Sequence, residues 1–194
     1  MRQLGTVATV FVGIIIGLVA CSSNGDAHAQ DGHAGHQAAP FAGVTKAVAA
    51  IRGTQGNEKV KGTVWFTQAD KGIKVVADVE GLSPDGVHGF HIHEWGDTTS
   101  ADGTSLGSHY NPEGHPHGGP GEPQSHAGDF GNLKADGDGK AHLELTLEGV
   151  SLVGENAILG RGLVVHAQPD DLKSQPTGNA GARIGVAVIG VAKP

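Results

Sequence analysis

Histidines are concentrated in one stretch of this 194-residue sequence, between Gly89 and Asp129. His91 and His93 are separated by one residue, so on a β-strand both side chains project from the same face while the residue between them points into the core. A segment rich in glycine and proline follows, and it carries His109, His117, His126 and Asp129. Three imidazoles and one carboxylate complete a tetrahedral zinc shell. The stretch therefore predicts a metal site built from a strand and a folded-back loop.

Short alternating segments dominate the rest of the chain and are expected to form strands. They span residues 60–68, 73–79, 89–93, 141–147, 163–166 and 184–191. Apolar and polar residues alternate without helical periodicity, and glycine-rich turns separate the segments, which predicts an antiparallel sandwich or barrel. Two irregular stretches, residues 94–131 and 167–182, interrupt the pattern. Loops this long within a compact domain are normally functional.

The first 20 residues have the pattern of an export signal. Arg2 precedes an apolar run that is short for a membrane span, and the run ends in Leu-Val-Ala before Cys21, which is similar to a bacterial lipoprotein processing site. We expect cleavage before Cys21, which would leave this cysteine as the lipidated first residue. An ordinary signal peptide with a stray cysteine and an uncleaved anchor are the alternatives.

Residues 21–43 are small and polar and are expected to form a flexible tether, followed by one domain over residues 44–194. The tether contains His28, His33 and His36. Histidine-rich tracts bind metals, so these three residues either scavenge copper or zinc or are bystanders in a polar linker. The sequence leaves both alternatives open.

Charge and cysteine usage limit the partners of the domain. The formal net charge is −7, and removal of residues 1–20 reduces 13 basic residues to 12 against 20 acidic ones, which gives −8. This balance argues against binding to nucleic acid or to an anionic lipid surface, so contact with a membrane is expected only through the lipid anchor. Cys21 is the only cysteine, so no intrachain disulfide can form.

Six motifs, in the order GFHIHEWGD, HYNP, HGGP, HAGDFGN, LVVH and GNAGAR, resemble the copper/zinc superoxide dismutase family. The resemblance covers roughly residues 46–194. The successive intervals are eight residues from His109 to His117, nine from His117 to His126 and three from His126 to Asp129. The fold it implies is all-β: an antiparallel Greek-key barrel or flattened, immunoglobulin-like sandwich with two long functional loops.

The resemblance also implies two metal shells that share one histidine. Imidazoles suit Cu(II), and imidazoles with a carboxylate suit Zn(II). Asp170 matches a family aspartate that hydrogen-bonds one copper histidine and one zinc histidine, here His91 and His117, and such a link fixes ring orientation. The implied copper ligands are His91, His93, His109 and His166, and the implied zinc ligands are His109 as a bridging imidazolate, His117, His126 and Asp129.

The implied activity is that of an enzyme, a superoxide dismutase that converts two superoxide anions and two protons to oxygen and hydrogen peroxide. Copper would alternate between Cu(II) and Cu(I), zinc would be structural, and His109 would carry a proton to the product. Arg183 matches a family arginine that orients the small anion. The alternative, from another class, is a non-enzymatic metal-binding or copper-delivery lipoprotein on the same barrel. Loss of a copper histidine or of Arg183 would favour it, and this chain keeps them.

These inferences predict an exported protein, in the periplasm or at the cell surface, lipid-anchored to a bacterial membrane. A homodimer is one arrangement open to it, because family members pair through different surfaces. In the loop before Arg183, Lys173 is the only other cation, so substrate steering would depend on lysines elsewhere. We assign no metal role to His88, His115 or His142, and expect His142 at the surface or paired across strands.

The family disulfide between the metal loop and the last strand is absent. Its cysteines are expected at the positions of Gly103 and Val186. Closing a loop of about 83 residues would stabilise the fold by roughly 4 to 5 kcal/mol on the chain-entropy model. Without this link, metal binding must contribute more to the order of the loop, so we expect an unusually large loss of stability in the metal-free protein.

Overall fold

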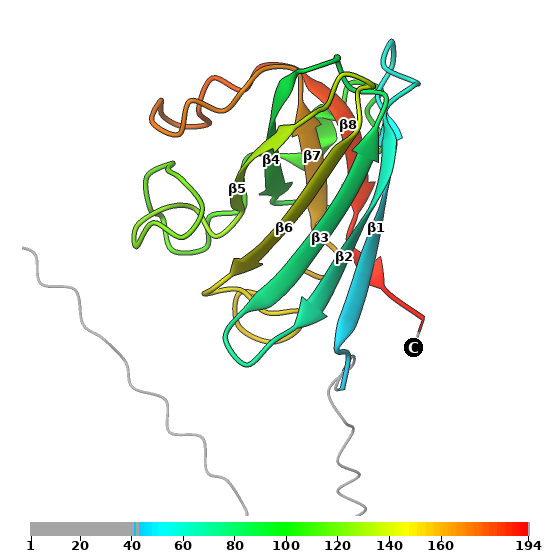
Figure 1. Cartoon of the computed structure of the whole chain (residues 1–194). Coiled ribbons are helices and arrows are strands. Elements are labelled where there is room, and N and C mark those ends of the chain that lie inside the picture. The colour runs from blue at the N-terminus through cyan, green and yellow to red at the C-terminus, as the bar shows by residue number, and fades with distance from the viewer. Residues whose placement is uncertain (1–40, 42, 194) are drawn as a thin grey trace, which may run out of the picture. The chain divides into compact units, whose positions relative to one another are not determined.

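The computed structural model describes residue 41 and residues 43–193, which form one antiparallel sheet. The hydrogen-bonded order is β5-β4-β7-β8-β1-β2-β3-β6, and a short β9 also pairs with β1 (Figure 1). One 3₁₀ turn, η1 (Thr104–Leu106), lies in the loop after β4. The strands are β1 (Lys46–Gly53), β2 (Lys61–Gln68), β3 (Ile73–Glu80), β4 (Val87–His93), β5 (Asp129–Lys134), β6 (Ala141–Leu147), β7 (Gly162–His166), β8 (Arg183–Val188) and β9 (Gly190–Val191).

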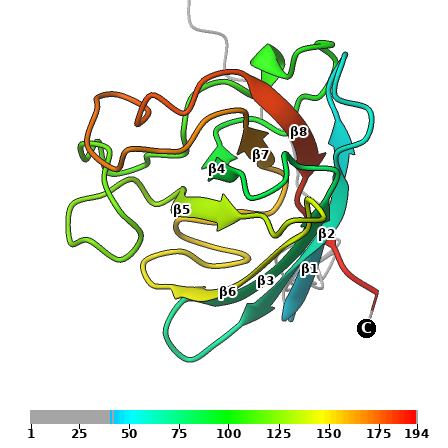
Figure 2. The same cartoon turned by 45° about the horizontal axis from the view of Figure 1, so that its top comes forward.

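The sheet curls until its two edge strands, β5 and β6, contact each other, so that the barrel is nearly closed (Figure 2). The chain crosses the barrel after β3, pairs β4 with β5, returns to place β6 beside β3, and crosses again to place β7 beside β4. This order is that of a Greek-key barrel. The predicted all-β antiparallel fold is confirmed.

The barrel interior follows from strict alternation along the strands of the β1-β2-β3-β6 half. On β3, Ile73, Val75, Ala77 and Val79 are buried, whereas Lys74 and Asp78 between them are exposed. Side chains on alternate positions of a strand point to opposite faces, so every second residue enters the core. The interior therefore consists of apolar side chains on this half of the barrel.

The strands of the other half are buried on both faces. Every residue of β7 and all but the first of β4 are buried, because the loops of residues 94–128 and 167–182 cover the outer face of these strands. Phe90 and Ile92 of β4 are fully buried and belong to the core, where Phe90 packs edge-to-face on Phe130 with ring centroids 5.3 Å apart. His91 and His93 alternate with them and point to the covered outer face, as the sequence predicted.

The structure corrects the strand prediction at three places. β1 was not predicted, because its apolar positions are mostly alanines and give a weak alternation signal. β5 begins at Asp129, inside the stretch expected to be loop, and a Gly-containing hexapeptide at the end of a long loop carries little β signal. The predicted strand over residues 184–191 is interrupted at Ile189, whose backbone N–H and C=O bond to Arg161 and Gly160 instead.

The expected signal peptide (residues 1–20), Cys21 and the three histidines of the tether lie outside the described residues. Among the residues that the structure does describe, no helix has the length and apolar character needed to cross a membrane.

Candidate metal centre

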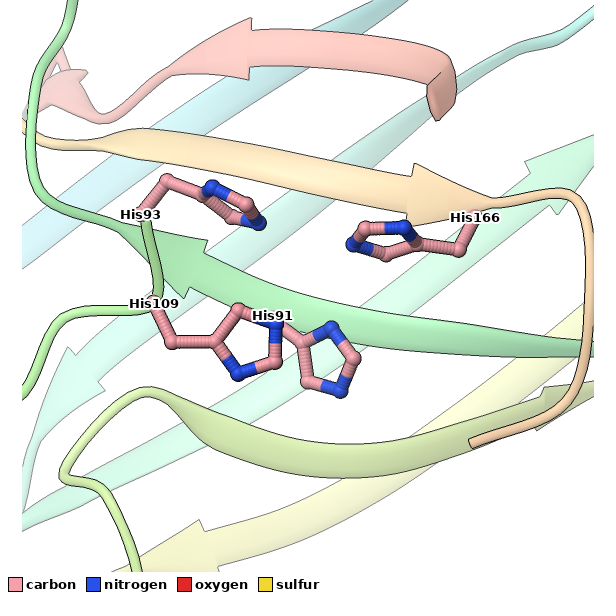
Figure 3. A group of neighbouring side chains, drawn as sticks. All are labelled: His91, His93, His109 and His166. Atoms are coloured by element: carbon pink, nitrogen blue, oxygen red, sulfur yellow. The ribbon is translucent and has the colours of Figure 1, made fainter. Parts of the chain in front are cut away.

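Four imidazoles meet on the covered outer face of β4 and β7. His91 and His93 come from β4, His166 ends β7, and His109 comes from the loop after β4 but forms a β-bridge with His93 (Figure 3). One ring nitrogen from each residue lies within 4.8 Å of the others. All four residues are buried, with at most 4% of their surface exposed. Four buried imidazole nitrogens grouped this closely indicate a metal site.

Each imidazole of this group has one nitrogen engaged and one free. The Nδ1–H groups of His93 and His166 donate to the carbonyl oxygens of Gly107 and Gly181, at 3.0 and 3.1 Å. These bonds leave Nε2 of both residues buried without a hydrogen-bond partner in the part of the chain that the structure describes, and the same holds for Nδ1 of His91 and Nε2 of His109. A buried polar atom without a partner is costly, and a bound ion satisfies all four at once. The residues present therefore fit a metal with nitrogen ligands.

A second group shares His109 and surrounds the Asp129 carboxylate. Its atoms are the Nδ1 atoms of His109, His117 and His126, which lie 3.0, 3.1 and 3.4 Å from the nearer carboxylate oxygens. Ligands about 2.0 Å from a zinc ion at tetrahedral angles are separated by about 3.3 Å. These spacings fit one tetrahedral ion, with Asp129 held by the N–H groups of Gly118 and His126 at 3.1 Å each.

The Asp170 carboxylate connects the two groups. Its Oδ2 accepts from Nε2–H of His91 and its Oδ1 from Nε2–H of His117, both at 2.8 Å. The backbone of Asp170 is paired with the side-chain amide of Asn132, at 2.8 and 2.9 Å. Because both Nε2 atoms are occupied by protons, both Nδ1 atoms are left as ligands. One carboxylate thus orients a histidine in each group, as the resemblance implied.

Comparison with known proteins agrees with this geometry. Residues 60–189 match the family model described as copper/zinc superoxide dismutase. The chain belongs to this family. A protein named "Superoxide dismutase [Cu-Zn]" from Paramecium bursaria Chlorella virus 1 is 48% identical over 157 residues, which cover 77% of this chain and 82% of the viral protein.

Family membership assigns the metals of the two groups. The all-imidazole group is the copper site, and the group that contains Asp129 is the zinc site, with His109 as the shared ligand. All seven predicted ligands are brought together by the structure. A copper/zinc superoxide dismutase needs the copper-site histidines to be neutral donors, and their surroundings favour that form.

Burial lowers the pKa of the copper-site imidazoles. It lowers that of His166 to about 3 and that of His109 to about 4, although Asp129 raises the latter in part. His93 is lowered well below its ordinary value, first by burial and then by neighbouring His109 and Arg183. Because these imidazoles are uncharged at neutral pH, one nitrogen of each ring carries no proton and is available as a ligand.

Arg183, at the start of β8, lies beside the copper site. Its guanidinium donates from Nη1 to the carbonyl oxygen of Gly103 and from Nη2 to that of Gly107, the residue that also accepts from His93. Burial lowers its pKa, but a guanidinium remains charged. The fold thus fixes a permanent positive charge close to a copper ligand, in a superoxide dismutase whose net charge is negative.

Gly103 and Val186, where the family disulfide was expected, lie against each other. A Cβ atom on Gly103 would be 2.8 Å from Cγ1 of Val186. Val186 is buried with Leu106 and Val164 in a small cluster of its own, outside the barrel core. In this superoxide dismutase, apolar packing and the two hydrogen bonds of Arg183 connect the loop to β8 in place of a covalent link.

The remaining histidines of the described domain have no place in either metal group. His142 is exposed and its Nδ1 lies 2.7 Å from Asp78 of the neighbouring strand, which confirms the predicted cross-strand position. His115 contacts Glu113 at 3.3 Å. His88 was assigned no role, but it is buried and its Nδ1 lies 2.8 Å from the carbonyl oxygen of His166. A side-chain bond to a distant backbone has no sequence signal, so this support of a copper ligand was missed.

Proposed function

We propose that this protein converts two superoxide anions and two protons to one molecule of oxygen and one of hydrogen peroxide. The observation that carries the proposal is the convergence of four buried imidazole nitrogens that no group of the described residues satisfies, beside a second ligand group that shares His109. Copper held by the four imidazoles would supply the one-electron redox change that this reaction needs. All four positions needed for this chemistry are occupied by histidine.

The residues around the site bind the anion, hold a proton and orient the ligands. The Arg183 guanidinium attracts and orients the anion, because its charge is permanent and its position is fixed by two backbone carbonyls. His109 Nε2 is placed to hold a proton for the peroxide product, and its Nδ1 side keeps the ring in position against Asp129. Asp170 keeps the His91 and His117 rings oriented.

The second candidate function is metal binding or copper delivery without catalysis. Metal analysis and a superoxide dismutation assay on the copper- and zinc-loaded protein distinguish the two, with His166→Ala as the matched variant. We expect activity in the wild-type chain and its loss in the variant. Full copper occupancy without dismutation would refute the enzyme and leave the delivery function.

We also propose that the chain is exported and held at a bacterial membrane, in the periplasm or at the cell surface, by a lipid on Cys21. The support is the sequence pattern of residues 1–21 alone. Mass analysis of the mature N-terminus after expression in a bacterium tests it. We expect an acylated Cys21 as the first residue, and a Cys21→Ser variant that is released from the membrane fraction. An unmodified N-terminus at any other residue would contradict the proposal.

A homodimer is proposed through the face that carries Trp95 and Val188. These side chains are 61% and 39% exposed. They are near each other, since a Cβ on Gly96, the residue after Trp95, would lie 3.1 Å from Val188 Cγ1. Large contiguous apolar patches mark protein contacts, and we place these two side chains in one such patch. Sedimentation should give a dimer for the wild-type chain and a monomer for Trp95→Glu; an unchanged dimer in Trp95→Glu would exclude this face.

A further inference from the structure

One side chain in the loop between β7 and β8 pairs with the backbone of a zinc ligand. The Gln175 amide receives the His117 N–H at Oε1, at 2.8 Å, and donates from Nε2 to the His117 carbonyl oxygen, at 2.9 Å. Both backbone groups of one residue are thus satisfied by one amide, in the way that two strands pair. Gln175 as a residue is exposed, but both contacts are partly buried.

His117 depends on this pairing. It is buried, with 4% of its surface exposed, and it lies between proline and glycine residues outside any strand. Among the described residues, its N–H and carbonyl oxygen have no backbone partner. Buried backbone groups need partners, so the position of His117 along the loop is set by Gln175.

The same loop also holds the His117 side chain. Asp170, five residues before Gln175, accepts from Nε2–H of His117 at 2.8 Å. The residues from 170 to 175 therefore hold both ends of this ligand: the carboxylate turns the ring, and the amide fixes the backbone. His117 Nδ1 is left directed at Asp129, 3.1 Å from its Oδ2.

The segment that presents Gln175 is folded by its own hydrogen bonds. Asp171 Oδ1 accepts from the N–H groups of Lys173 and Ser174, at 3.0 and 2.8 Å. Its Oδ2 accepts from the Ser174 hydroxyl and the Asn179 amide, at 2.6 and 3.1 Å. None of these bonds involves a metal ligand. The backbone that carries Gln175 is therefore already ordered, so little conformational entropy is lost when its amide pairs with His117.

We propose that Gln175 is a positioning residue for the zinc site. Its amide fixes the backbone of His117, keeps Nδ1 in the ligand position, and so couples zinc binding to the order of the loop that leads to Arg183. In a domain that has no cysteine, this two-point pairing joins the two long loops without a covalent bond. The proposal rests on the zinc site and not on the proposed catalysis, so the two fail separately.

Three variants test the pairing. Gln175→Ala removes the amide, Gln175→Met removes its hydrogen bonds but keeps most of its volume, and Gln168→Ala is the matched control, because Gln168 lies in the same loop, is exposed and makes no side-chain hydrogen bond to the described residues. Zinc dissociation constants are measured on the full chain by competition with a chromophoric chelator. The visible spectrum of Co(II) bound in place of zinc reports the ligand geometry.

We expect zinc binding to weaken about tenfold in both Gln175 variants, as for other groups that orient metal ligands, and the Co(II) spectrum to change. The control should keep the wild-type constant and spectrum. Wild-type zinc affinity in Gln175→Met would show that volume matters and would overturn the proposal. So would an equal loss of melting temperature in the metal-free and zinc-loaded Gln175→Ala proteins, because that result would mean a general structural role.

Discussion

A disulfide restored between positions 103 and 186 should stabilise this protein, but only when both cysteines are introduced. A Cβ on Gly103 would lie 2.8 Å from Val186 Cγ1, so the two Cβ atoms are close to the separation of about 3.5–4.5 Å that a disulfide needs. Gly103 has a φ of 79°, which a residue with a side chain adopts at a cost of about 1–2 kcal/mol. Gly103→Cys alone should therefore destabilise the fold.

The gain from the double variant follows from three contributions. Closing the loop of about 83 residues contributes about 4.5 kcal/mol on the chain-entropy model. The positive φ at position 103 removes about 1–2 kcal/mol of this. Replacing Val186 in its buried cluster with Leu106 and Val164 costs about 1 kcal/mol more. The net increase in unfolding free energy is about 2 kcal/mol, equivalent to about 4–8 °C in melting temperature for a domain of this size.

The comparison is made on a Cys21→Ser background, so that the two new thiols are the only ones present. Melting temperatures of the metal-loaded Gly103→Cys/Val186→Cys protein are measured before and after reduction, with thiol titration to verify the bond. We expect the oxidised form to melt higher and the Gly103→Cys single variant to melt below the parent. Two titratable thiols under oxidising conditions, or equal melting temperatures of the oxidised and reduced forms, would refute the packing described between Gly103 and Val186.

Three further predictions follow from the metal centre. Asp170→Ala should weaken both zinc and copper binding by about 10–100-fold, because His91 and His117 lose the same orienting group; chelator competition for each metal tests this, and loss at only one site would contradict it. Removal of both metals should lower the melting temperature much more than any single loop substitution, because six buried ring nitrogens then have no partner; equal melting of metal-free and loaded protein would oppose the expected dependence of loop order on metal. Metal-free stability should be greatest near pH 6.5. Burial lowers the pKa of His166 to about 3, so the unfolded chain takes up its proton first and stability falls as the pH drops below 6.5. Although burial opposes it, hydrogen bonds to Asp129 and Asp170 raise the pKa of His117 to about 9, so its contribution is lost as the pH rises through that value. A melting temperature that rises steadily from pH 5 to pH 9 would disagree.

The alternation of residues along one strand was sufficient to predict part of the metal site. Alternation placed His91 and His93 on one face and Ile92 in the core, since period two is a property of any strand. His166 and Arg183 come from strands remote in sequence, and only the resemblance to a known family connected them with the cluster.

Other contacts could not be predicted from the sequence. The bonds of His88 to the His166 carbonyl and of Gln175 to the His117 backbone join side chains to peptide groups 78 and 58 residues away. Any residue offers the same peptide group, so no residue type marks the partner. β1 and β5 were missed for a related reason: alanine and glycine carry little preference for strands, and sheet neighbours determine these segments.

The exposed Trp95 gives the copper site an internal optical probe. Its indole lies against Gly107, where an added Cβ would be 2.6 Å from Cδ1, and the Gly107 carbonyl oxygen accepts from both His93 and Arg183. The other tryptophan of the sequence, Trp65, stands on the outer face of β2 between Val48 and Val76 of the neighbouring strands. A Trp65→Phe protein would retain one tryptophan, and the emission of its indole would follow copper loading without an added dye.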